Sequence, residues 1–240
     1  MNYIGASKYF GNGRRWTRFY WLGATRRMRA ALAAATRQGA PRTLRRGGAR
    51  IAAGLSLLVS FSAAAADLSI VLVETPAGVA RYVYLEGDLE LGDWSKFVKL
   101  LRRNPDAAGV LLQSNGGSAD DGLAIAKHIF EHGLDTMVTG TCHSVCAVMF
   151  LAGRVRYITP GATLTVHSAY RQLGDWVVED HAANATVAWF IGHMGYPLSL
   201  ARLWVSTRSD DAAAITIEMN AKLKLGFTVI DQVAAAVAEQ

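Results

Sequence analysis

The sequence predicts an α/β fold: a mainly parallel β-sheet with helices packed around it and a helical C-terminal part. Segments rich in Val, Ile and Leu alternate with segments of helical period, which is the pattern of parallel-sheet proteins. One of them, 108–113 (AGVLLQ), is a continuous apolar run, as expected for a strand buried on both faces. Hydrophobic residues make up 51% of the 240, which is enough for one globular domain.

Residues 1–66 form a basic leader that differs in composition from the rest. They hold 12 of the 25 Lys and Arg residues and no acid, so all 19 acidic residues lie in 67–240. The uncharged run 51–66 follows the positive region and ends in small residues, which is typical of a signal peptide or a signal anchor. The run is shorter than the ~20 residues that span a bilayer comfortably. We expect export to the periplasm or cell envelope, with membrane contact only through this leader.

Other interpretations of the leader stay open. Met28 is an alternative start, and a basic arm for nucleic acid or anionic lipid is a further possibility. Because 67–240 is acidic overall and offers no basic face, we expect no nucleic-acid partner.

Residues 67–240 contain no repeat or linker and predict one domain. It opens with two segments rich in Val, Ile, Leu and Tyr, 68–74 and 79–85, which predict strands. The segment 93–103 has apolar residues at helical spacing, and Pro105 follows it as a helix stop.

The second half continues the alternation of helices and strands. Residues 121–132 are amphipathic with an acidic start, and Gly133 supplies a C-terminal stop. The other expected elements are strands at 135–139, 155–158, 162–166 and 226–230, a short apolar helix at 145–152, and a helical stretch from about 176 to 223.

A glycine turn follows the buried strand, in 111–122 (LLQSNGGSADDG). Two adjacent glycines let the backbone turn sharply and aim N–H groups outward, where they can hold a phosphate or an oxyanion. The segment has neither the Rossmann nor the P-loop pattern of glycines. A plain turn is the alternative interpretation.

A serine opens the short apolar helix in 139–153 (TGTCHSVCAVMFLAG). Ser144 follows a strand and a tight turn of small residues, and the next N–H, of Val145, can face the same pocket. The alternative is an ordinary helix-capping serine. His143 is adjacent, but adjacent side chains on such a turn diverge.

A histidine ends the strand in 162–170 (ATLTVHSAY). Parallel-sheet proteins place reactive groups at strand ends, so His167 is a candidate base, although a lone histidine also fits a structural or surface role. A nucleophile at a helix start, a base at a strand end and a pair of backbone donors are the parts of acyl-transfer catalysis.

Residues 79–167 resemble the Clp protease proteolytic subunit family of the ClpP/crotonase superfamily. Asp88 and 226–231 (GFTVID) extend the resemblance more weakly. The spacing of 23 residues between Ser144 and His167 is also close to that of the family. Four separated segments carry it in the family's order: 84–89 (YLEGDL), 113–117 (QSNGG), 143–147 (HSVCA) and 165–169 (TVHSA).

The resemblance implies a site. Ser144 would attack a carbonyl, His167 would take its proton, and the N–H groups of Gly116 and Val145 would hold the oxyanion. The stretch 204–211 (WVSTRSDD) places Ser206 where the family has its aspartate. Asp210, or Asp211, could substitute from the next turn, and both could equally be acids that open a helix.

The resemblance also implies a function: an exported ClpP-like serine hydrolase, most simply a peptidase, that requires no cofactor or metal. Its substrates would be peptides or unfolded proteins. We expect a homo-oligomer, and no ATP-dependent unfoldase because an exported chain has no ATP to use. A catalytically degenerate binding or scaffold protein of the same fold is the alternative, and acyl-CoA chemistry of the crotonase type is a third reading that export disfavours.

The two cysteines, Cys142 and Cys146, bracket Ser144. We expect buried free thiols; a disulfide is the alternative, and a cysteine nucleophile a third reading. Zinc would need more ligands than these and His143. His128 and His132 have the spacing of a metal pair, but we expect a solvated helix face. Four aromatic residues are expected in the core or at an interface: Trp176, Trp189, Phe190 and Trp204.

Overall fold

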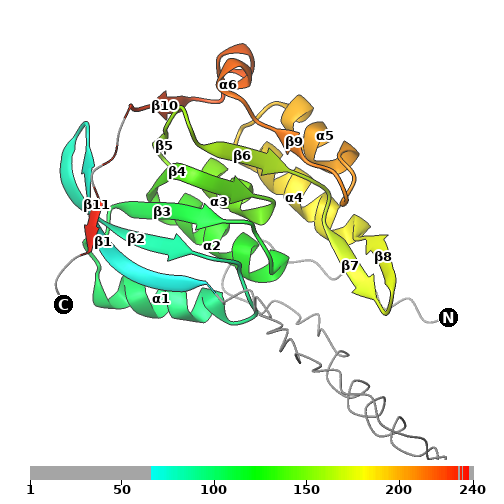
Figure 1. The fold of residues 1–240 in the computed structure, drawn as a ribbon, viewed down its shortest axis with the longest axis horizontal. Helices are drawn as coiled ribbons and strands as arrows, with labels where there is room; N and C mark the ends of the chain where they lie inside the picture. Colours follow the sequence, from blue (N-terminus) through cyan, green and yellow to red (C-terminus); the bar gives the residue numbers. More distant parts are fainter. Residues whose placement is uncertain (1–65, 232, 234, 238–240) are drawn as a thin grey trace, which may run out of the picture. The chain divides into compact units, whose positions relative to one another are not determined.

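The computed structural model describes residues 66–231, 233 and 235–237, and Figure 1 shows their fold. Within these residues it is a mixed α/β fold with six helices and a mostly parallel central sheet, as the sequence predicted. The predicted leader lies outside the described residues except for Ala66. No helix of the described part is both long and apolar enough to cross a membrane.

Seven strands of the central sheet run in the order β10-β5-β4-β3-β2-β1-β11, with β6 beside β4 and β9 beside β6. The neighbours from β2 to β10 are parallel, and β1 pairs antiparallel with both β2 and β11. The strands are β1 (Asp67–Thr75), β2 (Gly78–Glu86), β3 (Gly109–Ser114), β4 (Asp135–His143), β5 (Arg156–Ile158), β6 (Thr163–Val166), β9 (Ala213–Ala214), β10 (Phe227–Val229) and β11 (Ala235–Val237).

The strand β4 has two partners on the same side. Its first part, 136–138, pairs with β5, and its last part, 141–143, pairs with β6. Both pairings are parallel, so β4 and β6 end at the same edge of the sheet. This edge carries Ser144 and His167, because each follows directly on the end of one of the two strands.

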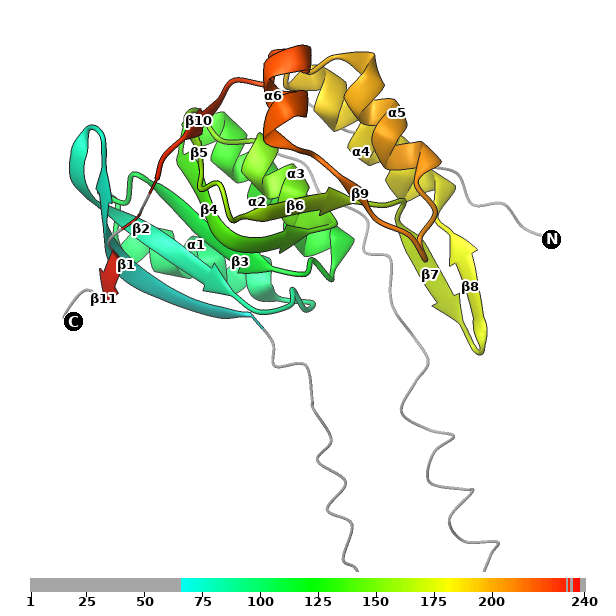
Figure 2. The same cartoon turned by 45° about the horizontal axis from the view of Figure 1, so that its top comes forward.

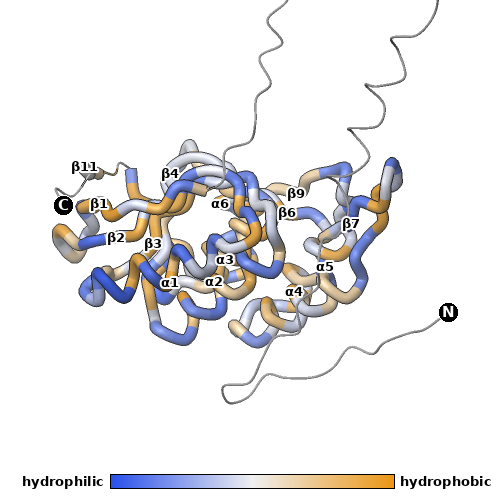
Figure 3. The backbone as a smooth tube through the Cα atoms, turned by 90° about the horizontal axis from the view of Figure 1, so that it is seen from below, coloured by the Kyte–Doolittle hydropathy of each residue, from blue (hydrophilic) through white to orange (hydrophobic). Residues whose placement is uncertain are grey.

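Six helices of the described part of the chain accompany the sheet. Figures 1 and 3 show α1, α2 and α3 together on one side of the strands, and Figure 2 shows α4 and α5 side by side beyond β6. The helices are α1 (Asp93–Arg103), α2 (Ala119–His132), α3 (Val145–Leu151), α4 (His181–His193), α5 (Leu198–Ser206) and α6 (Ile217–Leu223).

The hydrophobic core has two parts because successive residues of a strand face opposite sides of the sheet. Val110 and Leu112 of β3 belong to the large cluster that also contains the buried residues of α2 and α3. Leu111, between them, belongs to a smaller cluster with Tyr82 and Met137. All seven residues of α3 are buried, so the helix that follows Ser144 is fixed in the core.

Two helix boundaries follow their local signals. The helix α1 spans Asp93–Arg103, as predicted. The helix α2 begins two residues after the glycine pair, and the side chain of Ser118, which directly precedes it, accepts a hydrogen bond from the Asp121 N–H. It ends at Gly133, whose φ of 61° is the left-handed conformation expected of a glycine stop.

The prediction of a helical stretch from about 176 to 223 was wrong at its start and between α5 and α6, where residues 207–216 are not helical and include β9. Residues 176–179 form β8 (Trp176–Glu179), which pairs antiparallel with β7 (Tyr170–Leu173) in a separate hairpin. Gly174 and Asp175 form its two-residue turn, and Gly174 has a φ of 64°. A Gly-Asp pair between β-prone residues is a hairpin signal. It outweighs the helical tendency of the residues that follow it.

Candidate active site

Ser144 lies between β4 and α3 in a backbone conformation that residues other than glycine rarely adopt. Its φ is 54° and its ψ is −129°, and Lys224 is the one other non-glycine residue with positive φ in the described part of the chain. Such a conformation costs roughly 1–3 kcal/mol and persists where the surrounding structure imposes it. Here the Ser144 N–H donates to the Thr165 oxygen (2.9 Å), and its carbonyl accepts from the Ala147 N–H (2.9 Å).

The hydroxyl of Ser144 does not cap α3. It makes no hydrogen bond to the N–H groups of the first turn, although Ser144 occupies the capping position. The capping side chains of Ser118, Asp180 and Thr216 each accept such a bond at their own helices. The ordinary structural reason for a serine at a helix start is therefore missing here. Strain and an unused hydroxyl together are what a strained nucleophile turn presents.

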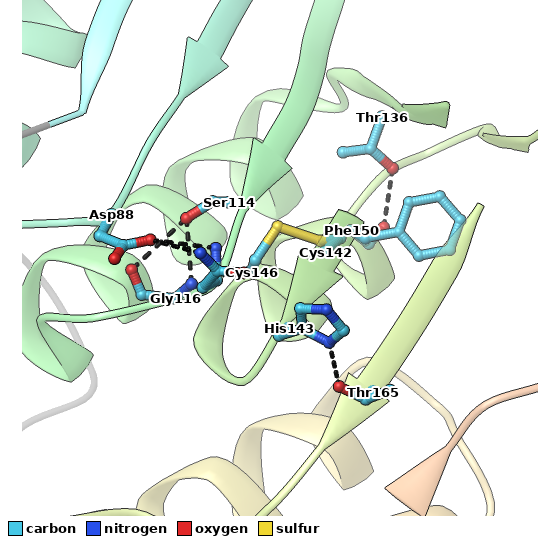
Figure 4. The surroundings of a disulfide bond; sticks show 10 residues. Asp88, Ser114, Gly116, Thr136, Cys142, His143, Cys146, Phe150 and Thr165 are labelled. Carbon is cyan, nitrogen blue, oxygen red and sulfur yellow. Dashed lines mark hydrogen bonds between the residues drawn. A yellow bond between two sulfur atoms is a disulfide. The ribbon is translucent and has the colours of Figure 1, made fainter. Parts of the chain in front are cut away.

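The glycine turn lies directly against Ser144. A Cβ atom built on Gly116 would be 2.8 Å from the Ser144 Cβ and 2.9 Å from the His143 oxygen, so no side chain fits there. The carboxylate of Asp88 holds the turn, because its Oδ1 accepts from the backbone N–H (3.3 Å) and the side-chain amide (3.1 Å) of Asn115 (Figure 4). This gives Asp88, a weak part of the sequence match, a specific role.

The two predicted oxyanion donors differ in whether their N–H group already has a hydrogen-bond partner within the chain. Val145 is the first residue of α3, where backbone N–H groups have no partner within the helix. The N–H of Gly116, in contrast, donates to the Oγ of Ser114 (3.0 Å). Ser114 is buried and also donates to the Gly116 oxygen (3.4 Å). In this structure the Gly116 donor is therefore occupied from within the chain.

His167 follows β6, and its ring is held by the chain next to it. The Nδ1 atom lies 2.9 Å from the backbone oxygen of Ser168. Since a carbonyl oxygen only accepts, Nδ1 carries the proton and Nε2 is left as the basic nitrogen. The N–H of Ser168 in turn donates to the Thr207 oxygen (2.8 Å), which ties this junction to the end of α5.

His143 is close to His167 but has another partner. Its Nδ1 is hydrogen-bonded to the Thr165 hydroxyl (Figure 4). Burial, and then the charge of the nearby His167, lowers the pKa of His143.

The two candidate acids have partners of their own. Asp210 is largely exposed and forms two bonds with the Arg208 guanidinium (2.8 and 3.0 Å), and this hydrogen bonding lowers the pKa of Asp210. Asp211 accepts from the Ala212 N–H (2.7 Å). Ser206, which aligns with the family's aspartate, is the exposed last residue of α5.

A polar cluster around Ser168 and Ala169, which follow His167 in the chain, was not predicted from the sequence. The buried Asn184 accepts from the Ala169 N–H (2.6 Å) and from Nε1 of Trp204 (3.1 Å), and donates to the Ala169 oxygen (3.1 Å). Glu179 accepts from the Ser209 N–H (3.1 Å), and the Ser168 hydroxyl beside it contributes most to lowering the pKa of Glu179. The Gly-Asp hairpin signal could have placed Glu179 here; nothing in the sequence pointed to Asn184.

The expectation of free thiols was wrong. Cys142 and Cys146 form a disulfide with a Cα–Cα distance of 5.2 Å, and no described cysteine is free. The geometry is attainable because the turn brings the strand end and the first helical turn within the usual Cα–Cα range. Both sulfurs are consumed, so the alternative of a cysteine nucleophile is excluded for this oxidised form.

The remaining candidates are accounted for by packing. No group of three or more potential metal ligands occurs among the described residues. The rings of His128 and His132 stack on each other (centroids 3.7 Å apart). His132 is exposed, as expected, whereas His128 is half-buried and packs edge-on against Trp94 of α1 (5.4 Å). Trp204 and Phe190 are core residues as expected, whereas Trp176 and Trp189 are exposed and do not belong to the core.

The predicted site residues from Gly116 to His167 lie in a part of the chain that matches a known protein family. Residues 95–187 match the family model of Clp protease, and this range includes Gly116, Ser144, Val145 and His167. The resemblance to that family and the ClpP-like fold are therefore confirmed. A search of curated proteins finds none that matches.

Solved structures give a more distant likeness. A mutant of the 1510-N membrane-bound stomatin-specific protease is 13% identical, with a TM-score of 0.44 over 58% of this chain and 72% of that one. A second mutant of the same protease, in complex with a substrate peptide, is 15% identical, with a TM-score of 0.43 over 58% of this chain and 68% of that one.

Proposed function

With the match of residues 95–187 to the Clp protease family as our premise, we propose that this chain is an exported serine hydrolase that cleaves peptides without ATP. The observation that carries the proposal is the backbone of Ser144, strained at a φ of 54° with its hydroxyl left out of helix capping. Helix capping does not explain a strained serine at this position, because the Ser144 hydroxyl does not cap α3. A nucleophile, in contrast, requires a hydroxyl that is free to react.

The proposed reaction starts with the Ser144 hydroxyl. As its oxygen attacks the carbonyl carbon, its proton passes to Nε2 of His167, the nitrogen left basic by the Ser168 carbonyl. The tetrahedral intermediate then expels the leaving amine, which takes that proton, and an acyl-serine remains. Water, activated by the same nitrogen, hydrolyses the acyl-serine and restores the hydroxyl.

Two backbone donors would stabilise the oxyanion. The N–H of Val145 is available at the start of α3, and the N–H of Gly116 would exchange its bond to Ser114 for one to the oxyanion. One such donor is typically worth ~10²–10³ in rate. The exchange would leave the buried Ser114 hydroxyl without the Gly116 N–H, and the free-energy cost of that loss offsets part of the gain in rate.

The third member of the site has two candidates. The Ser168 carbonyl already contacts Nδ1 of His167 and can orient the ring without a carboxylate. Asp210 is the other candidate, with Asp211 as its alternative. To contact His167, Asp210 would have to break its bonds with Arg208, and Asp211 its bond with the Ala212 N–H. A site without an acid remains capable of slow hydrolysis.

The disulfide supports the proposal of export. Disulfides persist in oxidising compartments such as the periplasm and are rare in the cytosol. We therefore propose that 1–66 is a signal peptide or signal anchor and that 67–240 is the exported domain. Homo-oligomerisation and peptide substrates are proposed with it, and no ATP-dependent partner is expected outside the cytosol.

A second function is favoured by one observation. The Gly116 N–H is occupied by Ser114, as expected if the fold serves as a binding or scaffold protein that no longer needs an oxyanion hole. Labelling with a fluorophosphonate, which reacts with activated serines, separates the two. We expect labelling of the full chain that is lost in both Ser144→Ala and His167→Ala. A folded protein that never reacts would establish the binding protein instead.

A further inference from the structure

A disulfide spans the turn that carries Ser144. Cys142 is the penultimate residue of β4 and Cys146 the second residue of α3, so only three residues lie between them (Figure 4). The loop closed is among the shortest possible, and the stabilisation that a disulfide gives to a whole fold grows with loop length. This bridge therefore restricts the unfolded chain less than one that closes a long loop, and its position across the turn points to an additional local effect.

Both ends of the bridge are anchored in rigid parts of the fold. The Cα of Cys142 is paired with Ser114 of β3 on one side and with Leu164 of β6 on the other. Cys146 lies in α3, which is buried along its whole length, and neither cysteine is exposed. The bridge thus joins the middle of the sheet to the core helix and leaves the three-residue turn little freedom.

The turn needs such a restraint because Ser144 is strained within it. An L residue with positive φ relaxes toward negative φ when its neighbours allow it. Two hydrogen bonds of the Ser144 backbone, to Thr165 and from Ala147, oppose this relaxation. The bridge adds a covalent restraint that begins two residues before Ser144 and ends two residues after it.

We propose that the Cys142–Cys146 disulfide is a positioning device for the nucleophile, which holds the Ser144 hydroxyl and the Val145 N–H in their reactive arrangement. This inference rests on the proposed function, because the residue that it positions is the proposed nucleophile. The disulfide touches no substrate; it acts through the backbone of the turn. Displacement of a reacting group by about 1 Å can cost ~10²-fold in rate, so a relaxed turn is expected to lose a comparable factor.

The test compares the full-length chain with a variant that carries both Cys142→Ala and Cys146→Ala. We measure the maximal rate of fluorophosphonate labelling and the probe concentration that gives half of it. The maximal rate is expected to fall ~10²-fold while the half-saturating concentration stays within about threefold. Loss of folded protein would lower the fraction labelled and leave the rate of the remainder unchanged, so a purely structural role gives a different result.

Val148→Ala is the matched control. Val148 is fully buried in the same helix and lies outside the bridged turn. Its truncation is expected to lower the melting temperature without changing the maximal labelling rate. If the double cysteine variant also keeps the wild-type rate, the proposal is overturned.

A second measurement does not depend on reactivity. Amide hydrogen exchange in a peptide covering 139–150 is expected to accelerate in the double variant, with little change in peptides from β1 and β2. Should the wild type fail to react with the probe, the proposed function fails, and this measurement still decides whether the bridge restrains the turn. Unchanged exchange there overturns the inference whatever the labelling shows.

Discussion

The backbone of Gly116 lies against the side chain of Ser144. A Cβ atom added to Gly116 would stand 2.8 Å from the Ser144 Cβ and 3.3 Å from its Oγ. Gly116 also has a φ of 97°, and its carbonyl accepts a 2.6 Å bond from the Leu89 N–H, so the turn cannot move aside freely. The two residues come from different loops, and the proposed site exists only while they stay in contact.

Gly116→Ala is accordingly expected to reduce the fluorophosphonate labelling rate at least ~10²-fold, because the added methyl group displaces Ser144. Stability should fall as well, by roughly 1–3 kcal/mol, since alanine disfavours this φ. The control is Gly161→Ala, where an added Cβ meets nothing within 4 Å. Equal labelling by the two variants would contradict the contact as a functional one.

Ser144→Gly is expected to stabilise the protein while abolishing labelling. Glycine adopts the φ of 54° and ψ of −129° without the strain that serine bears, so the free energy of unfolding should rise by about 1 kcal/mol. Urea unfolding of wild type and variant measures this. Lys224→Gly, at a φ of 53° far along the chain from the site, should be stabilised similarly and keep its labelling.

Asp210→Asn is expected to change the labelling rate by less than about tenfold. The reason is that Arg208 holds the Asp210 carboxylate and the Ser168 carbonyl already holds His167. Loss of an acid that does orient the histidine costs ~10⁴. A loss of that size in Asp210→Asn, or in Asp211→Asn, would assign the third role to that acid.

Asn184→Ala is expected to impair both folding and reactivity. It leaves the Ala169 N–H and the buried Trp204 Nε1 without their partner, at a cost of about 2 kcal/mol or more, whereas the Ala169 oxygen keeps its bond from the Asp180 N–H (2.8 Å). Because Ala169 is two residues from His167, the labelling rate of the folded fraction should also fall. Thr186→Ala, half-buried on the same helix with its hydroxyl bonded to the Ala182 oxygen, is the control and should alter neither quantity by much.

Glu179 is expected to add an acid-sensitive contribution to stability. Its pKa is lowered, chiefly by the Ser168 hydroxyl, so its stabilisation is present above the unfolded-state pKa of about 4.3 and disappears as the pH falls through the lower folded-state value. Urea unfolding between pH 3 and 6 should therefore show that wild type exceeds Glu179→Gln at pH 6 and loses this advantage below about pH 4. A constant difference across the range would contradict it.

Much of the fold could be predicted because the local signals were unambiguous. The apolar run of β3, the helical spacing of α1 and the glycine that ends α2 each specify one structure. The sequence also singled out Ser144 and His167, since both stand at ends of recognisable strands. The first strand of the hairpin at 170–179 was not predicted, and its second strand was predicted to be helical, because short β-hairpins have weak periodicity and the Gly174–Asp175 turn is their one clear sign.

The rest of the site depends on tertiary contacts that leave no local trace. Asn184 is one of several polar residues of α4, and only the fold reveals that it bonds Ala169 and Trp204. Likewise, the disulfide could not be told from free thiols by the spacing of its cysteines, because the conformation of the turn decides whether they meet.

The short pairing of β4 with β6 determines the relative position of Ser144 and His167 in the proposed site. Three residue pairs, ending at His143 with Thr165, set the alignment of the two strands whose ends carry Ser144 and His167. A slip by one residue would shift His167 about 3.3 Å along the strand and turn its side chain to the other face of the sheet. The register of these two strands thus sets the relative position of the proposed catalytic pair. A one-residue insertion within 163–166 would disable the pair without removing a single reactive group.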